Sequence, residues 1–273
     1  MNSIETSSLP LRIDASRFSD ALDAADYIVI HHLRDGSYQS SESWGPEGEI
    51  YRAICVWILV DVFNLTGKAK YIETARLILN RFRNKQCASG GWAIGLGADG
   101  LRFKITDAER DDSNKQEDPV IAGAMLKSIA DYSQSTESQE FIKMGDLAYQ
   151  YIVNIWDEDK GTISEDKNRE LTALRSNPDA YHFLVLQGLS AWEHFEADEI
   201  KTKISQILAF ISKTFENFDN DTMPLMLGYH VAILAKHRSH EYCKNIIQPK
   251  LEAYLHSELF ASDIITGGYG HRD

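Results

Sequence analysis

The chain has 273 residues, of which 43% are hydrophobic and 25% are charged, so it supplies enough apolar side chains for a large core. Its formal net charge of −13 disfavours nucleic acid as a partner, because binding phosphate requires a basic face. The cysteines are few and scattered, which predicts reduced thiols rather than a disulfide frame or a zinc site: Cys55, Cys87 and Cys243.

No membrane-spanning or targeting segment is visible in the sequence. Residues 1–17 lack an apolar stretch behind a basic flank, and the apolar run from Ile50 to Leu65 is interrupted by Arg52 and Asp61. We therefore expect a cytoplasmic protein without a membrane span. The sequence leaves the oligomeric state open.

The first part of the chain predicts an arm followed by helices of two kinds. Residues 1–14 are expected to form a loose arm, and residues 15–273 a single domain. Helices are predicted over about residues 15–33, 47–65 and 68–86. The second is apolar nearly all round and belongs inside, whereas the third alternates charged and apolar residues and belongs outside. A long polar loop over about residues 93–116 follows, and such loops are often functional.

The same alternation continues to the end of the chain. Apolar inner helices are predicted over about residues 119–134, 179–195 and 224–237, and amphipathic outer helices over about 137–156, 198–216 and 240–259. Each inner helix follows a proline, which suits the first helical turn: Pro46, Pro119, Pro178 and Pro224. Antiparallel hairpins place all the long outer-to-inner loops at one end, where we expect the functional site.

The turn Gln86-Cys87-Ala88-Ser89-Gly90-Gly91-Trp92 after an outer helix resembles the Q-W repeat of terpenoid cyclases and protein prenyltransferases. Weaker copies with tyrosine in place of tryptophan occur at residues 35–38 and 267–269. Similar Gly-Gly-Trp turns occur in six-hairpin glycosidases and α/α-toroid polysaccharide lyases. The resemblance implies an all-α fold, an α/α toroid of about four and a half hairpins over residues 15–273.

The chain also departs from these families. The D-x-D-D motif of protonating cyclases is absent, and Asp111-Asp112 lacks the third acid of a D-D-x-x-D metal motif. The scattered cysteines and histidines do not reproduce the prenyltransferase zinc site. We accordingly predict no metal and no cofactor. The hairpins are fewer than in a closed six-hairpin barrel, which leaves a short or open ring as an alternative.

The starts of the inner helices carry the catalytic candidates. Free backbone N–H groups there suit carboxylates, and carboxylates from two helices that face each other across a central cleft act as general acid and base. Acids at helix starts also serve as simple caps, and a Tyr-His pair inside an apolar helix serves either proton transfer or packing. The predicted catalytic residues are Glu47, Asp118, Asp179, Tyr181 and His182.

Aromatic and polar residues on the same loops are predicted to bind the substrate. Exposed aromatic rings stack on sugar faces, although a Gly-Gly-aromatic turn also wedges one hairpin against the next. We favour the ligand for Trp44 and the wedge for Trp92, and we place Arg272 as a cation for a substrate carboxylate or phosphate. The full set is Trp44, Trp92, Asp112, Glu117, Asn177, Tyr229, His230, Tyr269, His271 and Arg272.

Three functions remain open at this point. The acidic rim and the loop aromatics favour an enzyme that hydrolyses or eliminates a small-molecule or oligosaccharide substrate by acid/base chemistry. A terpenoid-cyclase-like enzyme would instead hold an isoprenoid in an aromatic cavity. A non-catalytic helical scaffold would bind a peptide or protein. Carboxylates and hydroxyls in the cleft favour sugar, a dry aromatic pocket with one acid favours cyclisation, and a flat concave surface favours the scaffold.

Overall fold

The computed structural model describes residues 15–31, 47–94, 116–163, 182–195, 197–217, 231 and 234–255. Regular structure in these ranges is almost entirely helical, which confirms the all-α prediction. The helices are α1 (Ala15–His31), α2 (Glu47–Thr66), α3 (Ala69–Lys85), α4 (Pro119–Thr136), α5 (Ile142–Asn154), α7 (His182–Trp192), α8 (Ala197–Asn217), α10 (His240–Tyr242) and α11 (Gln248–Leu255). A π-helical segment, η3 (Cys243–Ile247), joins the last two. In this part of the chain, no helix is both long and apolar enough to cross a membrane.

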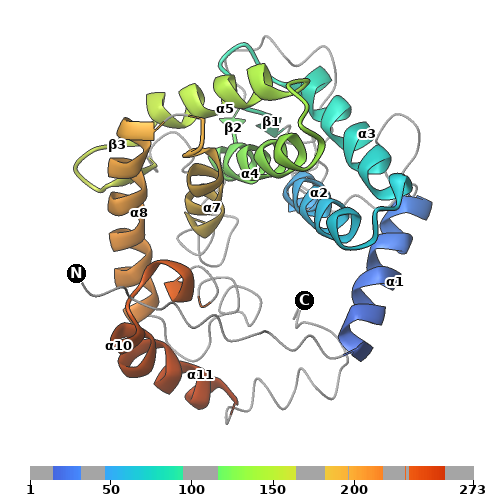
Figure 1. The fold of residues 1–273 in the computed structure, drawn as a ribbon. Coiled ribbons are helices and arrows are strands. Elements are labelled where there is room, and N and C mark those ends of the chain that lie inside the picture. The colour runs from blue at the N-terminus through green and yellow to red at the C-terminus, as the bar shows by residue number, and fades with distance from the viewer. Residues whose placement is uncertain are drawn as a thin grey trace, which may run out of the picture.

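The helices lie in two layers. Figure 1 shows α1, α3, α5 and α8 along an outer arc, with α2, α4 and α7 on its inner side. The central helix is α4, which packs against α2, α5 and α7. This arrangement follows from the side chains, because α4 buries residues all round its first two turns, whereas α3 and α8 each bury a stripe and expose most of their charged residues; Lys203 of α8 is buried.

Two short antiparallel hairpins, which the sequence does not predict, complete the described structure. Strand β1 (Ala93–Ile94) pairs with β2 (Gln116–Glu117), and β3 (Trp156–Asp157) pairs with β4 (Thr162–Ile163). Each strand has two residues, which is too short to show an alternating pattern. The first hairpin brings the turn after α3 beside the start of α4.

The ends of the helices follow the predicted signals with one difference. Gly67 adopts a left-handed φ of 67° and donates its backbone N–H to the Phe63 carbonyl at 2.7 Å, which ends α2 where the Thr66-Gly67 pair predicts. Helix α5 begins at Ile142 rather than near residue 137. The reason is that Glu137 takes a left-handed φ of 54° after α4, so the chain turns before it becomes helical again.

Helices α4 and α7 approach each other closely at two glycines. A Cβ atom added at Gly123 would lie 2.6 Å from the Val185 Cα, and one added at Gly188 would lie 2.2 Å from the Gly123 carbonyl oxygen. Both positions therefore require glycine for the two inner helices to touch at the backbone.

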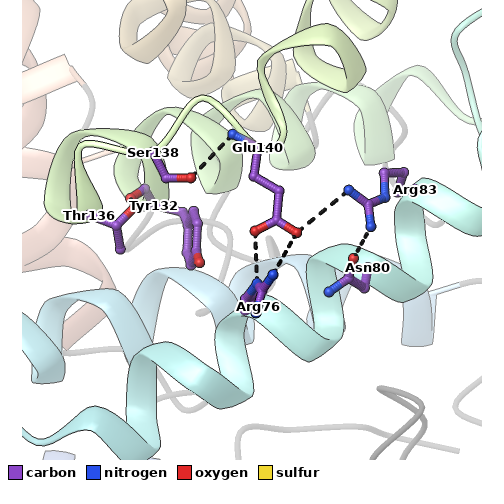
Figure 2. A network of polar contacts seen from close by, with 7 residues as sticks. All are labelled: Arg76, Asn80, Arg83, Tyr132, Thr136, Ser138 and Glu140. Carbon is purple, nitrogen blue, oxygen red and sulfur yellow. Dashed lines mark hydrogen bonds and ion pairs between the residues drawn. The ribbon is translucent and has the colours of Figure 1, made fainter.

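A polar network fixes α3 to the turn between α4 and α5 (Figure 2). Arg76 donates from Nε to Glu140 Oε2 at 2.7 Å and from Nη2 to Oε1 at 3.1 Å, a bidentate pair. Arg83 adds a weaker ion pair to the same carboxylate at 3.6 Å and is itself held by Asn80. Glu140 in turn donates its backbone N–H to the Ser138 hydroxyl, which fixes the turn.

Candidate functional site

Many of the residues predicted to form the site lie outside the described residues and stay predictions. These are Trp44, Asp112, Asn177, Asp179, Tyr181, Tyr229, His230, Tyr269, His271 and Arg272. Glu47 is the first residue of α2, as the proline before it predicts. The predicted inner helix over residues 224–237 is described only at residues 231 and 234–237, which are helical.

Asp118 occupies the capping position of α4. Its Oδ1 accepts the Val120 backbone N–H at 2.8 Å, and Pro119 follows in the first turn. The side chain is only 1% exposed, and the Asp118 backbone N–H is donated to the Trp92 carbonyl at 3.1 Å. In this position the carboxylate stabilises the helix start and is shielded from the surface.

Glu117 connects three segments beside that cap. Its Oε1 accepts the Ser89 hydroxyl at 2.5 Å, and its carbonyl accepts the Tyr151 hydroxyl at 3.1 Å. A Cβ atom at Gly91 would lie 2.6 Å from Glu117 Oε2, so the glycine is what admits the carboxylate. Burial, followed by the charges of Glu117 and Asp118, raises the pKa of Tyr151, which keeps the phenol protonated as a donor.

Trp92 is a wedge between hairpins. Its side chain is fully buried, its Nε1–H is donated to the Phe82 carbonyl at 2.8 Å, and the two rings meet edge to face at 5.9 Å between centroids. Gln86 holds the same turn by donating Nε2 to the carbonyls of Gly90 and Met144, each at 2.9 Å. No face of the Trp92 indole is open to a ligand in this position.

His182 opens α7 and packs toward the outer layer. The side chain is 4% exposed, and its ring lies 4.8 Å from the Phe210 ring of α8, centroid to centroid. The imidazole is therefore packed between an inner and an outer helix. That is the packing alternative that the sequence left open for this residue.

A charged cluster that the sequence did not single out lies on the inner helices. We call Asp61, Lys127 and Asp131 the inner charge cluster. Lys127 and Asp131 stand one turn apart on α4, with Nζ 2.5 Å from Oδ2, and their side chains are 27% and 20% exposed. Asp61 belongs to α2, which packs against α4. Its pKa is raised first by desolvation and then by the charge of Asp131, and Lys127 offsets part of the rise.

The inner charge cluster rests on an indole fixed by hydrogen bonds. The Lys127 ammonium lies 5.2 Å from the centroid of the Trp57 ring, within the range of a cation–π contact. Trp57 donates its Nε1–H to the Ser128 hydroxyl at 2.8 Å, and the single Ser128 proton has two acceptors within 2.9 Å, the Ala53 carbonyl of α2 and the Ala124 carbonyl of α4. The indole is 7% exposed and Ser128 is fully buried, so the base of the cluster is rigid.

Asp61 lies on the face of α2 that the described neighbours leave most open. Ile54, Ile58, Asp61 and Leu65 follow one another at helical spacing, and the last two are exposed. Leu65 is 61% exposed. Helices α1, α3 and α4 all pack against α2, and Figure 1 shows α2 on the inner side of the arc.

No family model, curated protein or solved structure matches this chain. The function must therefore be argued from the chemistry of the described residues.

Among the described residues, no group of three or more His, Cys, Asp or Glu side chains is arranged to hold a metal ion. The residue types of the inner charge cluster are suited to proton transfer. Lys127 neutralises Asp131, whereas Asp61 faces a carboxylate and is partly desolvated. A carboxyl whose pKa is raised by its surroundings favours the protonated form, which a general acid requires.

The inner charge cluster had a signal in the sequence. Asp61 interrupts an otherwise apolar helix, and Lys127 and Asp131 are the charged residues of an inner helix that is apolar around them. A charged residue on a helix predicted to be buried is as good a candidate for a functional role as one at the start of a helix. Sequence alone does not show that these residues belong together. Asp61 and Lys127 are 66 residues apart in the chain, and they come together only because α2 packs on α4.

Proposed function

We propose that the chain is an α/α-toroid enzyme that acts on a carbohydrate by acid/base hydrolysis or elimination, with Asp61 as general acid and Asp131 as general base. The observation that carries this proposal is that Lys127 and Asp131 form an ion pair on α4, which packs against α2, and that the charges of both residues act on the Asp61 carboxyl of α2. The two layers of helices support the toroid, and closure of the ring is part of the proposal.

The roles of the two carboxyls follow from their surroundings. Asp131 forms an ion pair with Lys127, and we assign to it the removal of a proton from water or from a sugar carbon. Asp61 is the carboxyl without that pairing, and its raised pKa favours the protonated form that a leaving-group oxygen requires. The rim residues predicted from the sequence, including Trp44 and Tyr269, are proposed to bind the oligosaccharide.

A substrate screen followed by matched variants tests the proposal. Aryl glycosides and polysaccharides are incubated with the full chain, with new reducing ends as the readout for hydrolysis and ultraviolet absorbance of unsaturated sugars as the readout for elimination. We expect Asp61→Asn and Asp131→Asn each to lower kcat by about 10²–10⁴-fold. Asp23→Asn on the exposed side of α1 is the control and should leave kcat unchanged. Equal activity in all three variants would refute the assignment.

One observation favours a second candidate. Ile54, Ile58 and Leu65 share the face of α2 that carries Asp61, so the acid stands in an apolar row. A protonated acid among apolar side chains suits a terpenoid-cyclase-like enzyme that protonates an isoprenoid. Turnover of a polyprenyl substrate without activity on any glycoside would select this alternative. Absence of turnover on both classes would leave the scaffold that binds a peptide or protein.

A further inference from the structure

A run of basic residues forms the turn before α10. The five residues 236–240 contain no acid, although the chain as a whole has a formal net charge of −13, and their basic side chains are Lys236, His237, Arg238 and His240. The run begins in a helical stretch, and α10 starts at His240. Figure 1 shows α10 away from α2 and α4, so this turn is separate from the inner charge cluster.

The guanidinium group of Arg238 is held in place by neutral groups. It donates to the Ser212 hydroxyl of α8 from Nε at 2.9 Å and from Nη2 at 2.6 Å, and Nη2 lies 3.3 Å from the Leu208 carbonyl oxygen. Its central carbon lies 5.5 Å from the centroid of the Tyr242 ring. Ser212 is 4% exposed and donates to the Leu208 carbonyl at 2.7 Å, so the support under the guanidinium is itself fixed.

No carboxylate compensates this cation. Within the described part of the chain, Arg238 forms no ion pair, and the N–H groups of its Nη1 atom have no acceptor. The carboxylate of Glu216 instead accepts the Tyr242 hydroxyl at 3.1 Å. Arginine side chains that are withdrawn from solvent are normally paired with an acid. Arg238, which is partly buried, therefore presents a fixed positive charge with unused donors.

The neighbouring imidazole also lacks a hydrogen-bond partner. His237 Nε2 is buried, and no described residue bonds to it, which is costly for a polar atom. Burial lowers the pKa of His237, the charges of Lys236 and Arg238 lower it as well, and Glu193 acts against them. A ligand with negatively charged oxygens beside this turn would supply both the counter-charge that Arg238 lacks and the acceptor that Nε2–H lacks.

We propose that the turn of residues 236–240 binds a phosphate group, free or as the monoester of a small molecule, with Arg238 as its fixed donor and His237 as a second donor. A phosphate dianion suits several cationic donors better than a carboxylate does, because it carries more oxygens and more charge. The net charge of −13 argues against the phosphates of a nucleic acid or an anionic membrane. This site does not rest on the proposed function.

Calorimetric titration of the full chain with orthophosphate, glycerol 3-phosphate and acetate tests the site directly. We expect saturable binding of a phosphate and weaker binding of acetate. Tighter binding of orthophosphate identifies the free ion as the ligand, and tighter binding of glycerol 3-phosphate identifies a monoester. Titrations that do not saturate with either phosphate, or acetate that binds as tightly as both, overturn the inference.

Matched variants assign the binding to the turn. Arg238→Gln removes the charge and should weaken phosphate binding by about tenfold or more, and Lys236→Gln, on an exposed side chain, by up to about fivefold. The control is Arg76→Gln, because that guanidinium is already paired with Glu140. It should lower the melting temperature and leave the phosphate affinity unchanged.

A purely structural role for Arg238 gives a different result. If Arg238→Gln lowers the melting temperature but binds phosphate as tightly as the unmodified chain, Arg238 only ties the turn to α8 and the inference is overturned. If Arg238→Gln does not fold, His237→Phe decides, because it keeps an aromatic ring and removes the nitrogen donors. Weakened phosphate binding in His237→Phe supports the site, and unchanged binding overturns it.

Discussion

The pKa values of two aspartates on neighbouring helices, Asp26 of α1 and Asp61 of α2, are shifted in opposite directions. Hydrogen bonds from Lys70 and then Tyr71 lower the pKa of Asp26, so its contribution to stability is present at neutral pH and is lost as the pH falls through the folded-state value. The raised pKa of Asp61 has the opposite effect on the pH dependence of stability. The folded state holds the extra proton, so stability falls as the pH rises through the folded-state value.

We therefore expect Asp26→Asn to lower the melting temperature at neutral pH and Asp61→Asn to raise it. For Asp61, which is exposed, the gain should stay below about 1 kcal/mol because solvent screens the charge. The difference for Asp61 should fade as the pH falls into the ordinary aspartate range, and that for Asp26 should fade only as the pH falls below it. Thermal unfolding at a series of pH values measures them, and a loss of stability in Asp61→Asn at neutral pH would show that the carboxylate is structurally required. A stabilising change that removes activity is what a functional site predicts.

At the scale of single elements, the turn after α3 depends on one glycine. Gly90 has a φ of 96°, and a Cβ atom there would lie 2.0 Å from the Leu147 carbonyl oxygen on α5. Gly67 also has a left-handed φ, of 67°, but nothing lies within 4 Å of its added Cβ. A comparison of Gly67 and Gly90 separates the free-energy cost of a left-handed backbone conformation from the cost of a steric clash.

Gly67→Ala should therefore destabilise the chain by about 1–2 kcal/mol, the cost of a left-handed alanine. Gly90→Ala should cost at least about 1–3 kcal/mol more, since the turn must move away from α5. Urea unfolding of both variants measures the difference. Equal losses of stability in the two variants would mean that the turn after α3 can shift at no energetic cost and does not hold Trp92 in place.

The elements also show which features can be predicted from sequence. Helix positions were predictable because charge alternates with apolar residues in α3 and is nearly absent from α4, and proline and glycine mark the ends. The pairing of β1 with β2 was not predictable, because strands of two residues are too short to show an alternating hydrophobic pattern. The capping role of Asp118 was predicted as an alternative to catalysis, and the choice required its burial and its bond to Val120.

At the scale of the whole molecule, the two layers determine which polar residues meet. Lys127 and Asp131 have the spacing of an ordinary surface ion pair, but they belong to α4, which lies on the inner side of the arc in Figure 1. Asp61 joins them because α2 packs beside α4. Such contacts depend on tertiary packing, which is why the candidate site was sought at the helix starts and is proposed on the helix faces.

The most direct measurement of the central claim is the pH dependence of kcat/KM on the glycoside that the screen shows to be turned over fastest. For the unmodified chain we predict a bell-shaped profile, in which the acidic limb reports the general base and the basic limb reports loss of the proton from Asp61. Asp61→Asn should retain low activity without the basic limb, and Asp131→Asn should lack the acidic limb. If both limbs persist in both variants, the acid and base lie elsewhere in the chain, and the account of the inner charge cluster is wrong.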